Sequence, residues 1–558
     1  TEVNFFIYIF NTERLLIFRQ SFFMLFILLT IFSLLIINFG NGLIVRNFLK
    51  IETQSFVLTS FLGMMSITMY ETILAFFFPL SSILELIFIT VGLIGIIWFL
   101  KSERLSLSNF KFNFWFYFFS LVILFSASFS PYLFDHQSYY VPTISYLKEV
   151  GFVKGISNLD LLLGQTSFWH IYQAGFSHFV DPFLKINAYL SVLFLIYIYE
   201  RKQYFSLIFL PVFLLFVQQP SPDLPILIIT LIVVNELINK QESPIILYLS
   251  LFAFCIKPIV FWLPLLVILN NIYSTKFNLK VFIPIVIFGS LFVAKNLWLF
   301  GFPIFPVSFI DFNLPWKPSQ EILTYSSQIG LMKTYDMKYA YQQVIEFSFF
   351  DKIYNWFTIG YKSVLNIGII VSLIIISIFT FKKNTKFYYL LLICIILKSI
   401  LILSFSAQYR FFIDVYVIAI FLIFKNLSEN SSVTTAVCLS VFISVIFTFP
   451  GFLQQFNIGK RLSNFSWSQL YKPIEKDLIT INEEYKIGNF NFNSSQNLND
   501  KVYFPSLNIY DLKLYDYYGV FPQQMGNDCK DGFYQRKLSA EEKIELKKII
   551  TETEKLKP

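Results

Sequence analysis

Long apolar segments separated by short polar turns recur along the first 450 residues of the chain. Several approach the roughly 20 residues that a helix needs to cross about 30 Å of hydrocarbon. The segments are continuous rather than alternating, which disfavours a β-barrel. The pattern predicts an all-α polytopic transmembrane protein with roughly 11–14 membrane helices, short hairpins included. The clearest spans are expected at about 21–39, 57–79, 82–100, 113–130, 183–199, 281–299, 364–381, 387–404, 411–424 and 432–449.

Two regions each combine a pair of short apolar segments with a polar break. The first pair, 204–217 and 224–238, is separated by a proline-rich turn, and the run 244–270 has Lys257-Pro258 near its middle. A single long span would place Lys257 at mid-membrane, whereas a hairpin would place it at an outer apex. Basic residues expected inside flank both ends of the run and require an even number of crossings, which favours the hairpin.

Lys and Arg clusters between the apolar segments predict the side of each loop, because cytoplasmic loops carry an excess of these residues. They place 40–54 and 101–112 in the cytoplasm. Two long loops, 131–182 and 301–362, are then outside. Residues 1–20 are apolar but interrupted by charges, which is typical of an interfacial helix.

The first outer loop is expected to contain two short helices, Thr143–Val150 and Ser167–Val180. Pro142 and Gly151 bracket the first, at positions where prolines begin and glycines end helices. Both segments are too short to span, so we expect them to lie on the membrane surface.

The sequence changes character after residue 450, where polar and Asn-rich segments replace the long apolar ones. Short strands are expected at Val502–Phe504 and Leu512–Tyr515. The last helix begins with a capping box of Ser539 and Glu542. The sequence therefore predicts a membrane domain of residues 1–450 and a small soluble α+β domain of residues 451–558 outside the membrane.

Composition agrees with this division. The chain of 558 residues is 56% hydrophobic and only 14% charged, with a mean hydropathy of +0.63, which excludes an ordinary soluble protein. The net charge of +8 comes from clusters between apolar segments, so it is a topology signal and does not indicate nucleic-acid binding. Three cysteines lie in apolar segments and one in the tail, so no disulfide framework is implied.

The stretch Ser130–Tyr140 is the leading candidate for chemistry. It follows an apolar segment and contains Asp135, His136, Tyr139 and Tyr140 within six residues. The carboxylate of Asp135 suits a general base or a metal ligand. A polar group this close to lipid is costly, which favours a functional role for Asp135. The alternative is that Asp135 caps the following segment while Tyr139 and Tyr140 are aromatic belt residues at the interface.

Basic residues at the outer ends of apolar segments are the second candidate feature. The topology places Lys257, Lys295 and Arg410 on the same side as Asp135. Snorkelling to the interface explains any one of them alone. Several together suggest a site for a lipid-linked phosphate, which Arg binds bidentately and Lys attracts as a point charge.

Other acids and histidines are weaker candidates. Asp160, Asp223 and Glu149 are possible second acids, although each is more often a turn or cap residue. His170 and His178 are eight residues apart, which is not a metal-ligand spacing on a helix. No glycine-rich phosphate loop or Walker motif is present, which argues against an ATP-driven pump.

The order and spacing of several motifs resemble those of GT-C fold glycosyltransferases. More narrowly, they resemble those of a bacterial group of uncharacterised GT-C-like membrane proteins. The resemblance covers the membrane part. It rests on Asp135…Tyr139, Gly151–Gly155, Asn158-Leu159, Ser167–Trp169, Lys257-Pro258, Lys295-Asn296 with Gly301–Pro306, and Tyr409-Arg410, with Lys530–Phe533 in the tail. His136 is not expected from that fold, and the first loop has no Asp-x-Asp, which leaves metal dependence open.

The resemblance implies a bacterial cytoplasmic-membrane enzyme with its tail on the periplasmic side. A polyprenyl-phosphate-linked sugar would be the donor, and a glycan, lipid or protein the acceptor. Asp135 would be the catalytic base of an inverting transfer. A divalent metal, Mg²⁺ or Mn²⁺, is the cofactor to consider. The substrate-binding residues would be His136, Tyr139, Tyr140, Lys257, Lys295, Asn296, Tyr409 and Arg410.

Two other functions fit the same class of sequence. A ligase or polymerase of lipid-linked polysaccharide would be expected to rely on arginines in large outer loops, but 301–362 contains none. A non-enzymatic transporter or assembly factor would need a path across the membrane and would tolerate Asp135→Asn.

Overall fold

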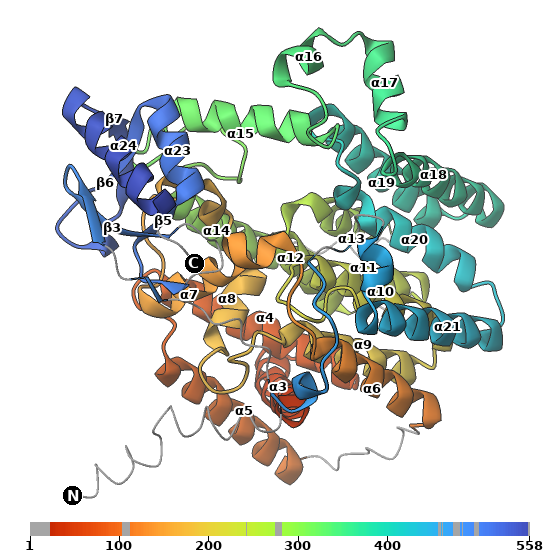
Figure 1. Ribbon diagram of the computed structural model, residues 1–558. Helices are drawn as coiled ribbons and strands as arrows, with labels where there is room; N and C mark the ends of the chain where they lie inside the picture. The colour runs from red at the N-terminus through yellow and green to blue at the C-terminus, as the bar shows by residue number, and fades with distance from the viewer. Residues whose placement is uncertain are drawn as a thin grey trace, which may run out of the picture.

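The computed structural model describes residues 23–102, 112–240, 243–273, 282–455, 459, 461–472, 480–481, 484–495 and 501–555. Helices dominate this part of the chain (Figure 1). The segment predicted as an interfacial helix, 1–20, lies outside the described residues. The helices before the second outer loop are α3 (Phe23–Phe48), α4 (Phe56–Ala75), α5 (Ser82–Ser102), α6 (Phe114–Ala127), α7 (Val141–Glu149), α8 (Phe168–Gly175), α9 (Ile186–Arg201), α10 (Leu210–Phe213), α11 (Asp223–Ile238), α12 (Pro244–Ile256), α13 (Trp262–Tyr273) and α14 (Phe282–Phe300).

The remaining helices divide between the second outer loop, the last apolar segments and the tail. They are α15 (Gln320–Lys333), α16 (Tyr341–Glu346), α17 (Phe349–Phe357), α18 (Ser363–Lys383), α19 (Lys386–Phe405), α20 (Ile413–Phe424), α21 (Glu429–Thr448), α22 (Gly451–Gln454), α23 (Ile509–Tyr518) and α24 (Ala540–Lys555).

Seven helices in the described ranges are long and apolar enough to cross a membrane: α3, α4, α5, α14, α18, α19 and α21. Shorter apolar helical segments accompany them at Phe114–Ala127, Tyr204–Phe213, Pro244–Ile256 and Pro258–Tyr273. The predicted mostly helical architecture with several apolar spans is therefore confirmed. Agreement is close for α5 against the predicted 82–100, which a proline-containing turn precedes and Lys101 ends, and for α14 against 281–299, which Lys280 precedes and Gly301 follows.

Glycines bring α3, α4 and α5 into close backbone contact. A Cβ added at Gly42 of α3 would lie 1.9 Å from the carbonyl oxygen of Thr59 on α4. A Cβ at Gly40 would lie 1.9 Å from the carbonyl oxygen of Gly92 on α5. Small residues at such contacts are the usual way in which apolar helices pack without a water-driven force.

The run 244–270 is broken at Lys257, as the hairpin interpretation requires. Helix α12 ends at Ile256, a single turn at Pro258–Val260 follows, and α13 begins at Trp262. The two helices contact each other. Proline after Lys257 removes a backbone donor and forces this residue out of helical conformation. Lys257 is thereby presented at the break.

The two short helices of the first outer loop are largely buried within the protein, and their expected position at the membrane surface stays a prediction. All eight residues of α8 are buried, and so are Ile144, Tyr146 and Leu147 of α7. Other parts of the chain cover them: the Ser167 hydroxyl donates to the carbonyl of Ile256 at 2.7 Å. Helix α8 also ends at Gly175, because the carboxylate of Glu85 accepts the amides of 178–180 outside the helix.

The second outer loop contains three helices where the sequence predicted none. Helices α15, α16 and α17 follow one another between α14 and α18. In Figure 1, α15 runs from the tail towards α16 and α17, which project beyond the rest of the molecule near α18 and α19. The loop therefore forms a helical arm over one end of the bundle.

The tail combines short strands with two helices. Its strands are β1 (Thr480–Ile481), β2 (Glu484–Ile487), β3 (Phe490–Ser495), β4 (Lys501–Val502), β5 (Ser506–Asn508), β6 (Val520–Gln524) and β7 (Phe533–Lys537). They form a parallel pair β1–β4, a mixed sheet β2–β3–β5 and an antiparallel pair β6–β7. The strand predicted at Leu512–Tyr515 is wrong, because these residues lie in α23, whose first turn is capped by Asn508.

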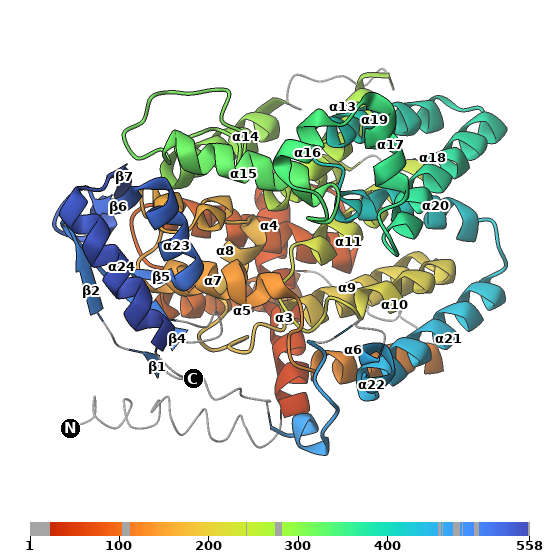
Figure 2. The ribbon, with the colours of Figure 1, turned by 45° about the horizontal axis from the view of Figure 1, so that its top comes forward.

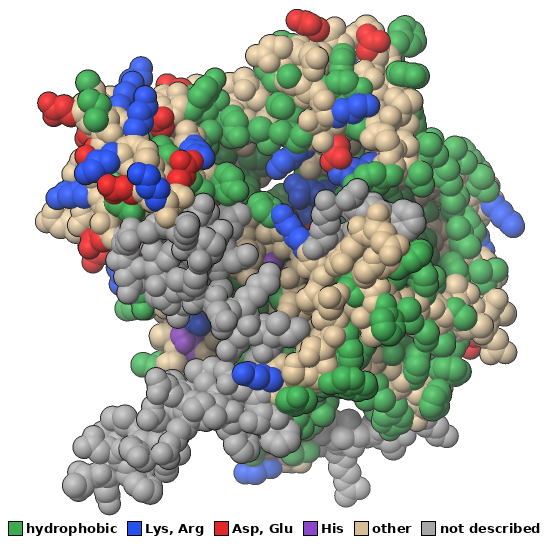
Figure 3. Space-filling model, viewed as in Figure 1, with side chains coloured by type: hydrophobic (Ala, Val, Ile, Leu, Met, Phe, Trp, Pro, Cys, Tyr) green, Lys and Arg blue, Asp and Glu red, His purple; other side chains and the backbone are tan. Residues whose placement is uncertain are grey.

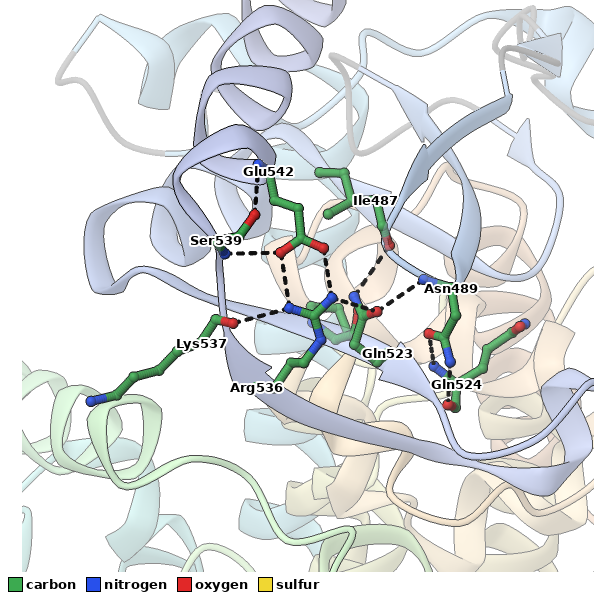
Figure 4. Close-up of polar contacts among 9 residues, drawn as sticks. Ile487, Asn489, Gln523, Gln524, Arg536, Lys537, Ser539 and Glu542 are labelled. Carbon is green, nitrogen blue, oxygen red and sulfur yellow. Dashed lines mark hydrogen bonds and ion pairs between the residues drawn. The ribbon is translucent and has the colours of Figure 1, made fainter.

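The predicted capping box of the last helix is confirmed (Figure 4). The Ser539 amide donates to Glu542 at 2.9 Å, and the Glu542 amide donates to the Ser539 hydroxyl at 3.2 Å. Arg536 of β7 donates to both oxygens of Glu542, at 2.9 and 2.6 Å. The cap thus ties α24 to the sheet beside it.

The tail packs directly on the first outer loop, beside α7 and α15 in both ribbon views (Figures 1 and 2). The Phe533 amide donates to the Lys154 carbonyl at 2.9 Å, and the Asn158 side chain donates to the Phe533 carbonyl at 3.0 Å. Gly155 has φ +59, and a Cβ there would lie 2.3 Å from the Phe533 carbonyl oxygen. Tail and first loop therefore lie on the same side of the helix bundle.

Candidate functional site

Asp135 stands at the entrance to the first outer loop. It follows α6 and immediately precedes a π-helical turn, His136–Tyr140, that continues into α7. Such turns are rare and occur often at functional sites. The Asp135 side chain makes no capping hydrogen bond, and Tyr139 and Tyr140 are buried. The capping and aromatic-belt interpretations of this stretch therefore do not describe these side chains.

The carboxylate of Asp135 pairs with Arg410. Arg410 Nη1 lies 3.6 Å from Asp135 Oδ2, and both side chains remain partly exposed. Arg410 comes from a short turn, Tyr409–Phe412, just before α20. The pair thus joins two segments that are 275 residues apart, and it leaves room for a ligand to reach both groups.

A second ion pair lies close to the first. Lys257, at the break between α12 and α13, pairs with Asp223 at the start of α11. Both pairs lie near the ring of Phe411, with Arg410 5.1 Å and Lys257 5.9 Å from its centre. Two carboxylates and two cations from four separate segments therefore meet around one aromatic ring.

Tyr139 and Tyr140 form the buried wall behind these groups. Their ring centres are 4.6 Å apart, and Tyr140 packs on His170 at 4.7 Å. Burial, followed by the charge of Asp135, raises the pKa of Tyr139, and Asp223 acts in the same direction. Burial raises the pKa of Tyr140 as well. Both phenols are therefore neutral hydroxyl groups at physiological pH, able to donate hydrogen bonds.

Lys333, the last residue of α15, adds a third cation that the sequence did not single out. Burial and the neighbouring charge of Arg410 lower the pKa of Lys333, while Asp135 opposes that effect. The helical arm of the second outer loop thus reaches the Asp135–Arg410 pair. Figure 3 shows Lys and Arg side chains gathered in a hollow beneath α15 and α16. Lys333 lies in α15, a helix that the sequence pattern did not predict. Predicting that helix would have been the only sequence signal for Lys333.

Lys295 and Asn296 are placed differently from Arg410. The Lys295 ammonium group is buried and donates to the carbonyls of Thr166 at 2.6 Å and Gln165 at 3.1 Å. The Asn296 side chain donates to the Pro303 carbonyl at 2.8 Å. Lys295 thus holds the first outer loop at Gln165 and Thr166, and Asn296 holds the turn that follows α14. The structure does not bring Lys295 into the cluster around Phe411.

The remaining candidate acids also separate. Asp160 caps a short turn, with its side chain accepting the Leu162 amide at 2.9 Å. It lies beside Asp511 of the tail, and burial raises the pKa of Asp160 to about 6. Glu149 is exposed at the end of α7. Of the second-acid candidates, only Asp223 is close to Asp135.

His136 and His170 lie behind the tyrosines. Burial lowers the pKa of each imidazole to about 3, so both are neutral. The Nδ1 atom of His136 has no hydrogen-bond partner among the described residues, whereas the His170 ring interacts with the Pro220 carbonyl. Buried polar atoms of this kind are normally satisfied by ordered water or by a ligand. Lys185 is also near, and donates to the carbonyls of Phe129 and Gln218.

The carboxylates of Asp135 and Asp223 each form an ion pair with a basic side chain. Within the described ranges, no group of three or more His, Cys, Asp or Glu side chains is arranged to hold a metal ion. Asp135 and Asp223 would be the carboxylate ligands of any Mg²⁺ or Mn²⁺, and each is paired with a base. The chemistry that this set of side chains supports directly is anion binding beside an acid.

A family model described as "Domain of unknown function (DUF8201)" matches residues 24–417. The chain belongs to the DUF8201 family. The DUF8201 match includes every residue of the Asp135 cluster and both outer loops, and it ends within α20, before the tail. No curated protein and no solved structure matches the chain. The site is thus a property of the DUF8201 region, to which the tail is attached.

Proposed function

We propose that this DUF8201 protein is a membrane glycosyltransferase of the GT-C type. It would take a sugar from a polyprenyl-phosphate-linked donor at the outer leaflet and transfer it, with inversion, to a glycan, lipid or protein acceptor. One observation carries the proposal: Asp135 pairs with Arg410, the charges of both act on Lys333, and Lys257 lies 5.9 Å from the ring centre of Phe411, the residue next to Arg410. A base beside a phosphate-binding cluster is what this reaction requires.

The cations account for donor binding and for the leaving group. Arg410 can bind a phosphate bidentately, and Lys333 adds a point charge. As the glycosidic bond breaks, its electrons go to the phosphate oxygen, and fixed cations stabilise the charge that develops there. Phosphate binding would also draw Arg410 away from Asp135, so donor binding would release the carboxylate for its own role.

Asp135 would then act on the acceptor. Its carboxylate accepts the proton of an acceptor hydroxyl while the oxygen attacks the anomeric carbon on the face opposite the phosphate. Attack from that face inverts the anomeric configuration. The neutral hydroxyls of Tyr139 and Tyr140 are available to hydrogen-bond sugar or phosphate oxygens.

The apolar helices support the proposed location. Seven candidate spans suit a bacterial cytoplasmic membrane, with both long loops and the tail on the periplasmic side. The tail contacts the first outer loop through Lys154 and Asn158, so it would stand next to the acceptor.

The test is complementation of a deletion strain, followed by mass spectrometry of lipid-linked and surface glycans. Asp135→Asn and Asp135→Ala should each lower transfer by about 10²–10⁴-fold, the usual effect of losing a general base. The lipid-linked donor should accumulate. Arg410→Ala should lower transfer through weaker donor binding.

Asp311→Asn is the matched control, because Asp311 also pairs with a lysine, Lys317 at 2.5 Å, in the second outer loop. This variant should retain wild-type glycans. If Asp135→Asn restores the complete glycan profile at normal protein abundance, Asp135 is not a general base. A transporter or assembly factor would give that result.

A further inference from the structure

Helix α17 has an apolar side that the protein leaves uncovered. Phe349, Phe350 and Tyr354 are 71%, 79% and 68% exposed, and Ile353 is also exposed. At 100° per residue these four side chains fall on one side of the helix, whereas Asp351, Lys352 and Asn355 fall on the other. Exposed apolar patches of this kind mark interaction sites.

Contacts at Lys352, Asn355 and Trp356 hold α17 to the protein, so the direction of its apolar side is fixed. The Tyr339 hydroxyl donates to the Asn355 side chain at 3.1 Å, and the Tyr335 hydroxyl donates to the Lys352 carbonyl at 3.4 Å. Trp356 donates to the Ala407 carbonyl at 2.9 Å. A capping box of Ser348 and Asp351 holds the first turn.

The exposed apolar side continues into the outer surface of a candidate span. Only residues 358–362 separate α17 from α18, and Tyr361 among them is exposed. Val364 and Ile367, at the start of α18, are exposed as well. Aromatic residues followed directly by an apolar span, with Lys362 at the junction, are typical of the membrane–water interface.

The arm that carries α17 projects beyond the bundle near α18 (Figure 1). In Figure 1, α16 and α17 project beyond the neighbouring helices, next to α18 and α19. Lipid would surround α18 if that helix crosses the membrane, as proposed above. The continuous apolar surface favours lipid over a protein partner as the occupant.

We infer that α17 is an interfacial helix that lies in the outer leaflet with Phe349, Phe350, Ile353 and Tyr354 inserted among the lipids. This inference rests on the membrane location in the proposed function but not on glycosyl transfer. It would tie the arm carrying Lys333 to the lipid surface, the source of a lipid-linked substrate. Such helices insert to about 5–10 Å, at the boundary between headgroups and acyl chains.

The experiment uses the full chain in nanodiscs of phosphatidylethanolamine and phosphatidylglycerol. In a background with Cys438→Ser and Cys529→Ser, single cysteines at Phe350→Cys and Tyr354→Cys carry a bimane fluorophore. Quenching by lipids with a nitroxide near the headgroup end of the acyl chain is compared with quenching by aqueous iodide. Both positions should be quenched several-fold more by the lipid nitroxide than Lys352→Cys, which is exposed on the polar side.

Ile374→Cys, on the exposed surface of α18, separates the two claims. If Ile374→Cys is quenched by lipid while Phe350→Cys and Tyr354→Cys follow iodide like Lys352→Cys, the inference about α17 is wrong and the membrane location stands. If Ile374→Cys also follows iodide, the membrane location itself fails. Energy transfer between differently labelled copies at position 350, without lipid quenching, would show a second copy on this surface and would also overturn the inference.

Discussion

Lys398 and Asp414 form an ion pair deep within the helices, with side chains only 0% and 3% exposed. Asp414 also accepts the Trp262 indole N–H at 2.7 Å. Burying two charges is expensive, and the pair offsets that cost only while both members are present. The two residues are 16 positions apart, on opposite sides of the turn between α19 and α20.

Removing one member of this pair should be costly. Lys398→Met leaves Asp414 charged and unpaired, and should destabilise the protein by about 3–5 kcal/mol. Adding Asp414→Asn should recover most of this loss, because the amide still accepts from Trp262. Thermal unfolding in detergent measures both variants. As a control, Lys513→Met breaks the exposed Lys513–Glu554 pair and should lower the free energy of unfolding by no more than about 1 kcal/mol. An equal loss of stability from Lys398→Met and Lys513→Met would contradict this prediction.

His170 should make stability depend on pH. Burial lowers its folded pKa to about 3, below the ordinary value of 6.5. Below pH 6.5 the unfolded chain therefore binds a proton that the folded protein does not. Stability from this residue is lost as the pH falls from 6.5 towards 3, by up to about 1.4 kcal/mol per pH unit.

The variant His170→Phe tests this dependence, since it keeps a ring against Tyr140 and cannot titrate. The Tm of the variant minus that of the wild type should become more positive as the pH is lowered from 6.5. A Tm difference that stays constant over this range would show that His170 is already able to charge in the folded protein.

At the scale of elements, the apolar spans and the break at Lys257 were predictable, because hydropathy and proline act locally. The burial of α8 was not predictable, because an apolar helix packs equally well against lipid and against other helices. The length of α8 does not distinguish these two environments. The helix α15 was missed because its mixed sequence has weak periodicity, whereas α16 and α17, of six and nine residues, are too short for a periodic pattern to stand out in the sequence. Lys333 was missed with them.

The motifs around Gly151–Gly155, Asn158 and Lys530–Phe533 have a structural explanation at this scale. Lys154, Gly155, Asn158 and Phe533 form the contact between the first outer loop and the tail, and Gly151 lies against the end of α4. Sequence resemblance grouped them with the site residues, but they hold two elements together. Of the candidate site residues, Asp135, Lys257, Asp223 and Arg410 come together around Phe411, and no local pattern could have shown that convergence.

Asn158 should control docking of the tail. Its amide donates to the carbonyls of Trp316 at 2.8 Å, Gly155 at 2.9 Å and Phe533 at 3.0 Å. Asn158→Ala leaves these carbonyls without that donor and should weaken docking by about 1–3 kcal/mol. Limited proteolysis should then release the tail faster. Asn489→Ala, which removes a bond to Gln524 within the tail, is the matched control and should not change the release rate.

Across the whole molecule, the contact between the tail and the first loop fixes their relative side. The Phe533 amide and the Tyr515 hydroxyl both bond to this loop, to Lys154 and Asn158. The opposite end of the bundle carries the turn between α18 and α19, with Lys382 exposed. If α18 crosses a membrane, residues on the tail and residues near Lys382 must face different compartments.

Cysteine labelling of intact cells tests this arrangement. In a background with Cys438→Ser and Cys529→Ser, Tyr517→Cys on α23, 81% exposed, should react with a membrane-impermeant maleimide. Lys382→Cys should react only after permeabilisation, since Ser363 and Lys382 lie near opposite ends of α18, an apolar helix of 21 residues. Reaction of both cysteines from outside would mean that α18 does not cross. Reaction of Lys382→Cys alone would invert the topology and place Asp135 in the cytoplasm, where nucleotide sugars rather than outer-leaflet lipid-linked sugars are the available donors.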